Sequence, residues 1–332
     1  MKYLKQLLKR AYWQEGNVSL KLFLVRQYMK HGFYRQHVFE DPKLHTDMYY
    51  FRAYKKHINW ENPDKLDEKL GILKCKYGHN ELSVQCADKY RVREYIEKRG
   101  LGYILNELYG VWDTWEDIDI SSLPEKFALK RNNDAGGVLV VDNKAAADLK
   151  ERVKKLGEGM NRECGLGAAE LQYSRIEPCF IAEKYIGNND GSFPYDYKFF
   201  CMNGKVRYIL VCIGREKGKK MLRFIVDRDF ILCPIMQGEQ IVTNEEIQKY
   251  KPSILPEMLK IAETLSEPFP FVRVDLYDYN GKVLFGEMTF TPMGAVNGYI
   301  NKEGQLLLGK YLDVSQKAFS REFINADIKE RV

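Results

Sequence analysis

Short blocks of apolar residues, bounded by Gly, Pro, Asn or Asp, recur along this chain and predict β-strands. Two pairs of blocks are joined by the dipeptides Asn203-Gly204 and Asn280-Gly281, which predict β-hairpins because both residue types accept positive φ. Elsewhere apolar residues recur every three or four positions, which indicates amphipathic helices. The expected strands are 126–131, 138–141, 179–186, 197–202, 206–213, 271–277 and 282–288; the expected helices are 65–75, 88–100, 255–265, about 305–324 and one starting at Asn143.

This order of elements predicts an α+β fold rather than a doubly wound parallel sheet, because the hairpins imply antiparallel pairs and the helices are segregated from them. A chain of 332 residues is long enough for two or three lobes. No stretch approaches the roughly 18 apolar residues of a membrane-spanning helix, and no signal peptide is visible.

The cysteines and histidines argue against a zinc site. The seven cysteines are scattered without a CxxC pair, and all five histidines precede residue 80. Several cysteines lie in apolar, strand-like runs, where buried reduced thiols are expected. We therefore expect a reducing, cytoplasmic location.

Positive charge is concentrated at the N-terminus. Residues 1–38 hold eight Lys or Arg and one acid, Glu15, a net charge of +7, whereas the whole chain carries +6. Because the apolar residues here have helical spacing, the segment is expected to be a basic helical extension. It either contacts the inner face of an anionic membrane or packs on the body with a solvated basic face. A nucleic-acid partner is not expected, since the remaining chain is not basic.

A glycine-rich turn between two expected strands is the first candidate for chemistry. It runs from Lys130 through Asn132 to Gly136 and Gly137. Glycines let backbone N–H groups approach phosphate oxygens, and a lysine at a strand end offsets their charge. The pattern is not a P-loop, and by itself it is typical of a simple turn.

An acidic hairpin is the strongest candidate, because Asp275 and Glu287 lie on adjacent, otherwise apolar strands. Buried acids are costly unless they are paired or bound to metal, so the pair suggests a Mg²⁺ site. A two-residue loop would place the two acids on opposite faces, whereas a three-residue loop, 279–281, would pair Arg273 with Glu287 on one shared face. The metal hypothesis therefore predicts the three-residue loop with a bulge. The alternative is an Arg273–Glu287 ion pair with Asp275 solvated.

Three further segments are weaker candidates. The strand 179–186 could present its end to a nucleotide base, or it is simply half-buried. A basic run contains Arg215 and Lys220 and would contact phosphate or an acidic substrate, although such runs are usually solvated loops. Asp227 and Asp229 superficially fit the DxD pattern of a glycosyltransferase.

Taken in order, these pieces resemble the ATP-grasp superfamily, most closely its TupA-like branch, which is linked to teichuronopeptide and capsular polysaccharide synthesis. The resemblance runs from about Asn62 to Tyr299. Its motifs are Asn62-Pro63 with Glu68-Lys69; 87–90 with 92–95; 110–112; 123–130; 196–199 with Asn203-Gly204; 269–275; and 286–289.

The resemblance implies an ATP-grasp fold of two α+β lobes that grip ATP between antiparallel sheets, with the basic helical segment added. It implies limits of 1–58 for the extension, 59–122 for the N-terminal lobe, 123–187 for the central lobe and 188–332 for the C-terminal lobe. It also implies roles for single residues. Those expected to bind ATP are Lys89, Lys130, Asn132, Gly136, Gly137, Glu183, Lys184, Tyr185, Ile186, Asp190, Lys198 and Lys220; those expected to bind Mg²⁺ are Asp275, Glu287 and Thr289; those expected to be catalytic are Arg273, Lys130 and Arg215.

The implied activity is that of an ADP-forming carboxylate–amine/thiol ligase that acts through an acyl phosphate. Its partners would be a small-molecule or glycan carboxylate and an amine acceptor, in the modification of a surface polysaccharide. The alternatives are a glycosyltransferase-like enzyme of capsule synthesis and a non-catalytic module that keeps the fold.

Overall fold

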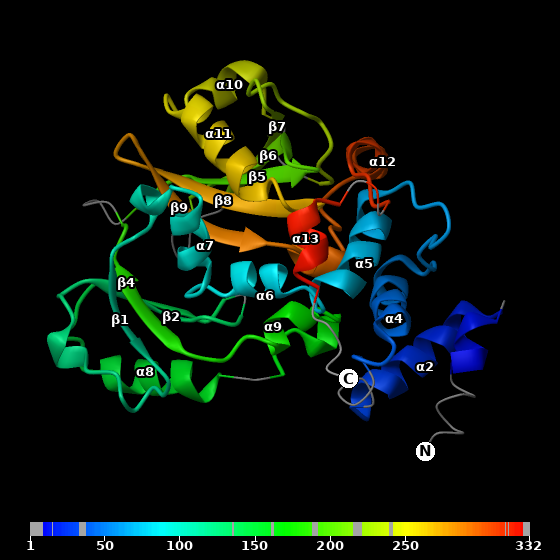
Figure 1. Ribbon diagram of the computed structural model, residues 1–332, viewed down its shortest axis with the longest axis horizontal. Helices are drawn as coiled ribbons and strands as arrows, with labels where there is room; N and C mark the ends of the chain where they lie inside the picture. The colour runs from blue at the N-terminus through cyan, green and yellow to red at the C-terminus, as the bar shows by residue number, and fades with distance from the viewer. Residues whose placement is uncertain are drawn as a thin grey trace.

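The computed structural model shows two antiparallel sheets with helices around them (Figure 1). This confirms the α+β class. The structure describes residues 9–14, 16–32, 38–134, 136–160, 163–187, 192–214, 221–238, 242–315, 317 and 319–327.

The smaller sheet has four strands in the order β1-β4-β2-β3. Its strands are β1 (Leu108–Trp112), β2 (Phe127–Arg131), β3 (Val138–Val141) and β4 (Phe180–Lys184). Phe127, Leu129 and Phe180 form a core on one face with helix α8 (Leu149–Glu158). Because side chains alternate along a strand, Ala128 and Lys130 point to the other face.

The larger sheet has five strands in the order β7-β6-β5-β8-β9. They are β5 (Asp196–Met202), β6 (Lys205–Ile213), β7 (Leu222–Asp227), β8 (Phe271–Tyr279) and β9 (Lys282–Thr289). Helix α11 (Leu255–Ser266) lies across one face, with α10 (Asn244–Gln248) beyond it (Figure 1). Val272, Val274 and Leu276 belong to the core on this side, so Arg273 and Asp275 project from the opposite face.

Helices from both halves of the chain complete the body. They are α4 (Pro42–Tyr54), α5 (Leu66–Tyr77), α6 (Glu81–Ala87), α7 (Val92–Lys98), α9 (Leu171–Ser174), α12 (Lys302–Tyr311) and α13 (Arg321–Asn325), with 3-10 turns η1 (Gly102–Ile104), η2 (Ile120–Ser122), η3 (Leu166–Ala168) and η4 (Pro292–Ala295). The limits inferred from sequence for the lobes stay a proposal; β1 pairs with β4 although it precedes residue 123.

The basic N-terminal segment packs on the body through α2 (Val18–Lys30), whose Val25 and Tyr28 join a small core with α4. Beside this core, Asp47 is fully buried and accepts hydrogen bonds from Tyr12 Oη (2.6 Å) and His57 Nδ1 (2.7 Å). Among the described residues, Ile58 N and Trp60 Nε1 also donate to this carboxylate, so its charge is compensated.

Three expected helices were wrong in extent. The helix expected over 88–100 spans only Val92–Lys98. The helix expected from Asn143 begins at Leu149, because Asn143 Oδ1 accepts from Ala145 N and forms a turn first. The expected helix over about 305–324 is divided into α12 and α13. Asn203 at the β5–β6 turn binds both backbone groups of Asp313, which prevents helix continuation there.

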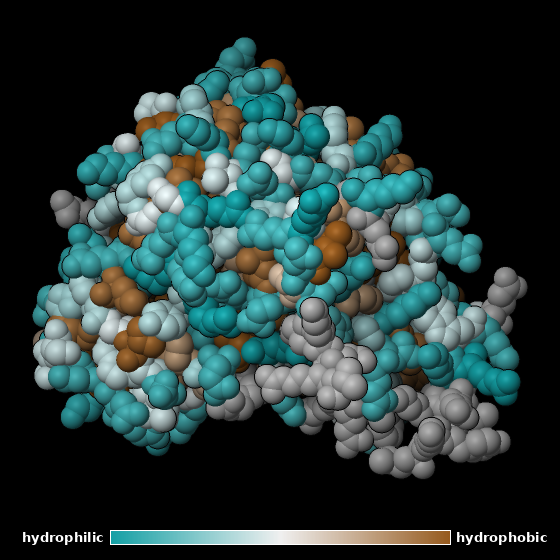
Figure 2. Space-filling view, viewed as in Figure 1, coloured by the Kyte–Doolittle hydropathy of each residue, from teal (hydrophilic) through white to brown (hydrophobic). Residues whose placement is uncertain are grey.

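Most of the face shown in Figure 2 is hydrophilic, with separate hydrophobic areas over the small sheet and near the middle. Among the described residues, no helix is long and apolar enough to cross a membrane.

Candidate active site

A cavity of about 510 Å³ lies between the two sheets. Its walls come from both sheets and from the segment before α7. The lining residues are Lys89, Asn106, Ala128, Lys130, Gly136, Val138, Val140, Lys184, Tyr185, Ile186, Phe193, Pro194, Lys198, Asp275, Tyr277, Gly286 and Glu287. Lysines and carboxylates therefore share one space, which the apolar side chains of Val138, Ile186 and Phe193 also line.

The register of the acidic hairpin differs from the expected one. Tyr279 pairs with Lys282 around a two-residue turn, in which Asn280 and Gly281 have φ of 56° and 74°. The three-residue loop was therefore wrong. A bulge at Gly286 shifts the register by one residue, so that Asp275 pairs with Glu287. The expectation of a shared face is nevertheless confirmed.

Gly286 suits this bulge. A Cβ at this position would lie 3.0 Å from the backbone oxygen of Asp275 and 3.0 Å from Tyr277 Cε2. The absence of a side chain lets the two strands approach at the point where the carboxylates turn to the same side.

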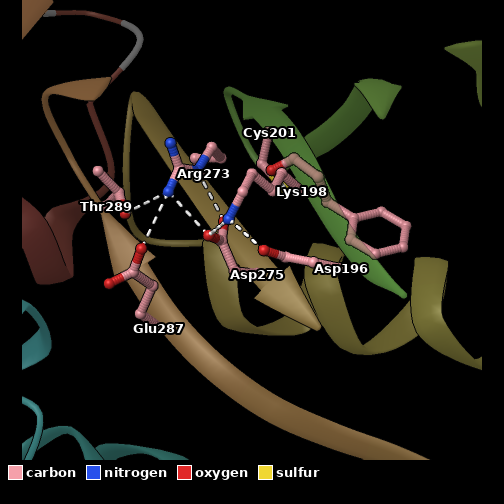
Figure 3. A network of polar contacts seen from close by, with 8 residues as sticks. Asp196, Lys198, Cys201, Arg273, Asp275, Glu287 and Thr289 are labelled. Carbon is pink, nitrogen blue, oxygen red and sulfur yellow. Dashed lines mark hydrogen bonds and ion pairs between the residues drawn. The ribbon is translucent and has the colours of Figure 1, made fainter. Parts of the chain in front are cut away.

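Arg273 draws the acids together (Figure 3). Its Nε lies 2.7 Å from Asp275 Oδ1, and its Nη2 lies 2.7 Å from Asp275 Oδ2, 3.0 Å from Glu287 Oε1 and 3.0 Å from Thr289 Oγ1. The Arg273–Glu287 ion pair of the alternative interpretation is present, but Asp275 is 1% exposed rather than solvated.

Lys198 on β5 supplies a second cation. Its Nζ donates to Asp275 Oδ2 and lies 2.9 Å from Asp196 Oδ2. Burial raises the pKa of Asp275, although Arg273 and Lys198 oppose this. Burial would also raise the pKa of Glu287, but the charges of Arg273, Lys198 and Lys89 outweigh it and lower that pKa. Glu287 therefore keeps its negative charge at neutral pH.

Two further lysines face the acids from the other wall. Lys130 Nζ pairs with Glu183 Oε2 at 2.5 Å, and Arg93 Nη1 approaches the other oxygen of Glu183 at 3.4 Å. Lys89 Nζ donates to the backbone oxygen of Asp134. Burial lowers the pKa of Lys89, partly offset by the nearby charges of Glu287 and Asp134. The acids and lysines expected from sequence are thus brought into one cavity.

The loop after β2 is ordered by its acid. Asp134 forms an ion pair with Arg131 at 2.5 Å and accepts from Gly137 N at 2.9 Å, so its charge is compensated. Gly136 has φ of 114°, and a Cβ at Gly137 would lie 2.2 Å from Arg131 Nε. Gly136 is therefore required by the backbone path, whereas the absence of a side chain at Gly137 leaves room for the side chains of Arg131 and Asp134.

Asn132 does not line the cavity, although it was expected to bind nucleotide. Its Nδ2 donates to Asp88 Oδ1 (3.0 Å) and Glu177 O (2.9 Å), and its Oδ1 accepts from Cys179 N (2.8 Å). Its side chain instead joins the loop to the segment before β4 and to the turn before α7.

Residues after β4 form the end of the cavity expected to hold a base. Tyr185 and Ile186 line it, whereas the Glu183 carboxylate is held by Lys130. The Lys184 oxygen accepts from Asn106 Nδ2 at 2.8 Å, so Asn106 fixes the end of this strand.

Sequence reasoning assigned no role to Arg93, Asn106 or Phe193. Arg93 lies inside a motif of the resemblance and binds the Asn106 oxygen through Nη2 at 2.9 Å. Asn106 and Phe193 lie in loops without periodic pattern, and no local signal could have found them. Of the expected site residues, Asp190, Arg215 and Lys220 lie outside the residues that the structure describes.

Comparison with known families decides the membership. A family model described as TupA-like ATPgrasp matches residues 68–313, most of the chain. The chain belongs to the TupA-like ATP-grasp family. The expected family and fold are confirmed, and with them the class of ATP-dependent ligases.

Solved structures of ATP-grasp ligases are similar only remotely. D-alanine–D-alanine ligase from Bacillus anthracis, complexed with ATP, is 14% identical over 75% of this chain and 68% of its own, with a TM-score of 0.42. D-alanine–D-alanine ligase from Helicobacter pylori is 15% identical over 77% of this chain and 69% of its own, with a TM-score of 0.40. D-cycloserine synthetase DcsG is 13% identical over 69% of this chain and 69% of its own, with a TM-score of 0.38. No curated protein matches this family member.

The donor set in this TupA-like chain suits a magnesium ion that also has phosphate ligands. Among the described residues, no three or more His, Cys, Asp or Glu side chains are grouped to hold a metal ion alone. Mg²⁺ commonly takes one or two carboxylates together with substrate phosphates and water. Asp275, Glu287 and the Thr289 hydroxyl are oxygen donors around one point, so the residues present fit such an ion.

Proposed function

We propose that this chain joins a carboxylate to an amine in an ADP-forming reaction that passes through an acyl phosphate. The observation that carries the proposal is the cavity in which Lys89 and Lys130 face Asp275 and Glu287. Phosphoryl transfer needs cations for the phosphate oxygens and carboxylates for the metal, and catalysis is then mostly positioning and electrostatic stabilisation.

In this mechanism Lys89 and Lys130 bind phosphate oxygens of ATP. Each is now held by an internal acceptor, the Asp134 oxygen and the Glu183 carboxylate. These contacts orient both ammonium groups toward the cavity. The backbone N–H groups of the loop at Gly136 and Gly137 would add uncharged donors to the phosphates.

The metal would be held by Asp275, Glu287 and Thr289. Magnesium, when bound, offsets negative charge on the transferring phosphoryl group. Arg273 stabilises the charge of the acyl phosphate and of the tetrahedral species formed by amine attack, because a guanidinium beside the metal acids can donate to two oxygens at once.

The remaining expected residues complete the nucleotide and substrate contacts. Lys184, Tyr185 and Ile186 would hold the adenine beside Phe193, and Asp190 would bind the ribose. Lys198 would act at the phosphates, with Arg215 and Lys220 contacting phosphate or an acidic substrate.

We propose that the reaction is a step in the modification of a surface or capsular polysaccharide, to which the carboxylate and the amine would belong. This part of the proposal rests on the family alone. The acidic pair that suggested the glycosyltransferase alternative, Asp227 and Asp229, belongs to a turn. Asp227 Oδ1 accepts from Asp229 N and Ile231 N, both at 2.9 Å, and so serves a turn after β7.

The decisive experiment is a thermal-shift titration with ATP, with and without Mg²⁺. Stabilisation is expected only with both ligands together, since each supplies part of the other's site. Asp275→Asn should abolish it. Asp278→Asn is the matched control in the same strand, because its Oδ1 accepts from Gly281 N, as an amide oxygen also can.

Product formation then separates the functions. Incubation with uronic acids and amino acids should release ADP and yield an amide detectable by mass spectrometry. Release of UDP from nucleotide sugars without ADP formation would instead favour a glycosyltransferase. If Mg²⁺ and ATP leave the melting temperature of the native protein unchanged, the ligase proposal fails.

We also propose a cytoplasmic location with peripheral contact of the N-terminal segment to an anionic membrane. The seven free thiols agree with a reducing compartment. On α2, Leu20 and Phe23 are 54% and 55% exposed on a segment whose sequence is strongly basic. Exposed apolar side chains with surrounding positive charge favour an anionic lipid surface.

Co-sedimentation with vesicles of phosphatidylcholine and phosphatidylglycerol tests this contact. The double variant Leu20→Ser/Phe23→Ser should lose most binding, because two inserted side chains are removed without disturbing the buried face. Ile231→Ser, in an equally exposed position (52%) after β7, should bind as the native protein does. Equal binding of all three proteins would contradict the proposal.

A further inference from the structure

One nitrogen atom occupies the point where the proposed metal ligands converge. Arg273 Nη2 lies 2.7 Å from Asp275 Oδ2, 3.0 Å from Glu287 Oε1 and 3.0 Å from Thr289 Oγ1 (Figure 3). These three oxygens come from two neighbouring strands, and the bulge at Gly286 brings them to one face. The guanidinium therefore fills the centre of the same donor set that was assigned to Mg²⁺.

A divalent ion and this nitrogen cannot share the position. Magnesium binds oxygen at about 2.0–2.1 Å, which is shorter than the contacts that the three oxygens make with Nη2. An ion held by the same oxygens would lie almost on the nitrogen atom, and both carry positive charge. Binding of the ion thus requires the guanidinium to move.

We propose that Arg273 is the resident cation of this site, and that a divalent metal ion binds there only by displacing it. The inference rests on the proposed function, because it takes the metal ligands from it. Displacement would release the guanidinium from Asp275 and make it available for the acyl phosphate, so metal loading and delivery of Arg273 would be one event.

The local charges explain why the exchange would depend on nucleotide. Arg273 and Lys198 stand against three carboxylates, those of Asp275, Glu287 and Asp196. The bidentate pair with Asp275 must be broken before metal binds, which weakens binding of the ion alone. A nucleotide phosphate would give the released guanidinium a new partner and so promote the exchange.

Metal binding without nucleotide tests this directly. Free Mn²⁺ is measured by electron paramagnetic resonance during titration of the purified full chain. Arg273→Gln should bind Mn²⁺ at least tenfold more tightly than the native protein, because it removes the positive charge that competes for the three oxygens. Arg207→Gln is the matched control, an arginine of the same sheet that stacks 4.9 Å from the Tyr311 ring centre; its affinity should equal that of the native protein.

The coupling to nucleotide gives a second readout. Addition of the non-hydrolysable analogue AMPPNP should increase the Mn²⁺ affinity of the native protein much more than that of Arg273→Gln. If Arg273→Gln does not fold, Arg273→Lys serves, because one ammonium cannot reproduce the two-point contact with Asp275 and its affinity should be intermediate.

The possible failures are distinguishable. Equal or weaker Mn²⁺ binding by a folded Arg273 variant overturns the displacement inference, while Mn²⁺ binding by the native protein with AMPPNP leaves the ligase proposal standing. Absence of Mn²⁺ binding in every protein, even with AMPPNP, overturns both.

Discussion

Asn132 is a fully enclosed polar side chain whose removal should weaken both the fold and nucleotide binding. It is 1% exposed, and its amide makes three hydrogen bonds, to Asp88, Glu177 and Cys179. Its own backbone oxygen accepts from Lys89 N at 3.2 Å. The side chain therefore fixes the position from which Lys89 reaches the cavity.

The cost of Asn132→Ala follows from its partners. Each lost bond contributes about 0.5–1.5 kcal/mol, and a buried donor left without an acceptor costs about 1–3 kcal/mol. Cys179 N becomes such a donor, whereas Asp88 keeps hydrogen bonds from Tyr90 N and Arg91 N. We expect a loss of about 2–5 kcal/mol in the free energy of unfolding, and about tenfold weaker ATP binding.

Asn132→Asp sharpens the test because it changes charge and hardly changes size. Its carboxylate could still accept from Cys179 N, but it would lie 3.0 Å from Asp88 Oδ1, where the amide donated. Burial already raises the pKa of Asp88. One of the two carboxyls must then hold a proton in the folded state, so the folded protein binds more protons and stability falls as pH rises.

Urea denaturation at pH 5.5 and pH 8, followed by circular dichroism, measures these effects. At pH 8, Asn132→Asp should have a lower free energy of unfolding than Asn132→Ala. At pH 5.5, Asn132→Asp should regain stability. Asn143→Ala, which removes an exposed asparagine from a local turn, should stay within about 0.5 kcal/mol of the native protein. Native-like stability of Asn132→Asp at pH 8 would refute the reasoning.

Three further changes test other parts of the structure. Burial lowers the pKa of His45 to about 4. The contribution of the neutral imidazole to the free energy of unfolding should therefore be fully present above pH 6.5 and fall by about 3 kcal/mol as the pH drops to 4. His45→Gln should remove most of this pH dependence in acid denaturation, and an unchanged profile would contradict the prediction. Gly286→Ala should cost about 1–3 kcal/mol and abolish Mg²⁺-dependent ATP binding by calorimetry, because its Cβ presses on the Asp275 backbone; native-like binding would mean that the bulge does not place the acids. Lys130→Met should weaken ATP binding at least tenfold in the same assay while the cavity fold is kept, and undiminished affinity would remove Lys130 from the phosphate site.

The sequence predicted a helix, strand or turn well where the signal for it lies in that segment's own residues. Alternating apolar residues located β2, β3 and the β8–β9 hairpin, because burial of one face requires that alternation. The Asn-Gly turns were found because positive φ is a property of those residues themselves. Lys130, Asp275 and Glu287 stood out because charged residues are unusual at the ends of, or inside, such apolar strands.

The sequence alone thus determined the family, the α+β fold and the residue types of the cavity, since all three depend on short motifs and periodicity. The tertiary structure alone decided how they meet. The bulge at Gly286 shifts by one residue the register that the turn would impose; a glycine inside a strand is compatible with a bulge, but the pairing of Asp275 with Glu287 is visible only in the structure. Asn132 binds Asp88 across 44 positions of sequence, and Arg93 reaches Glu183 across 90, so their roles arise only from packing of distant segments. A side-chain contact between two distant segments does not alter the hydrophobic periodicity of either segment. For this physical reason, such contacts could be identified only in the tertiary structure.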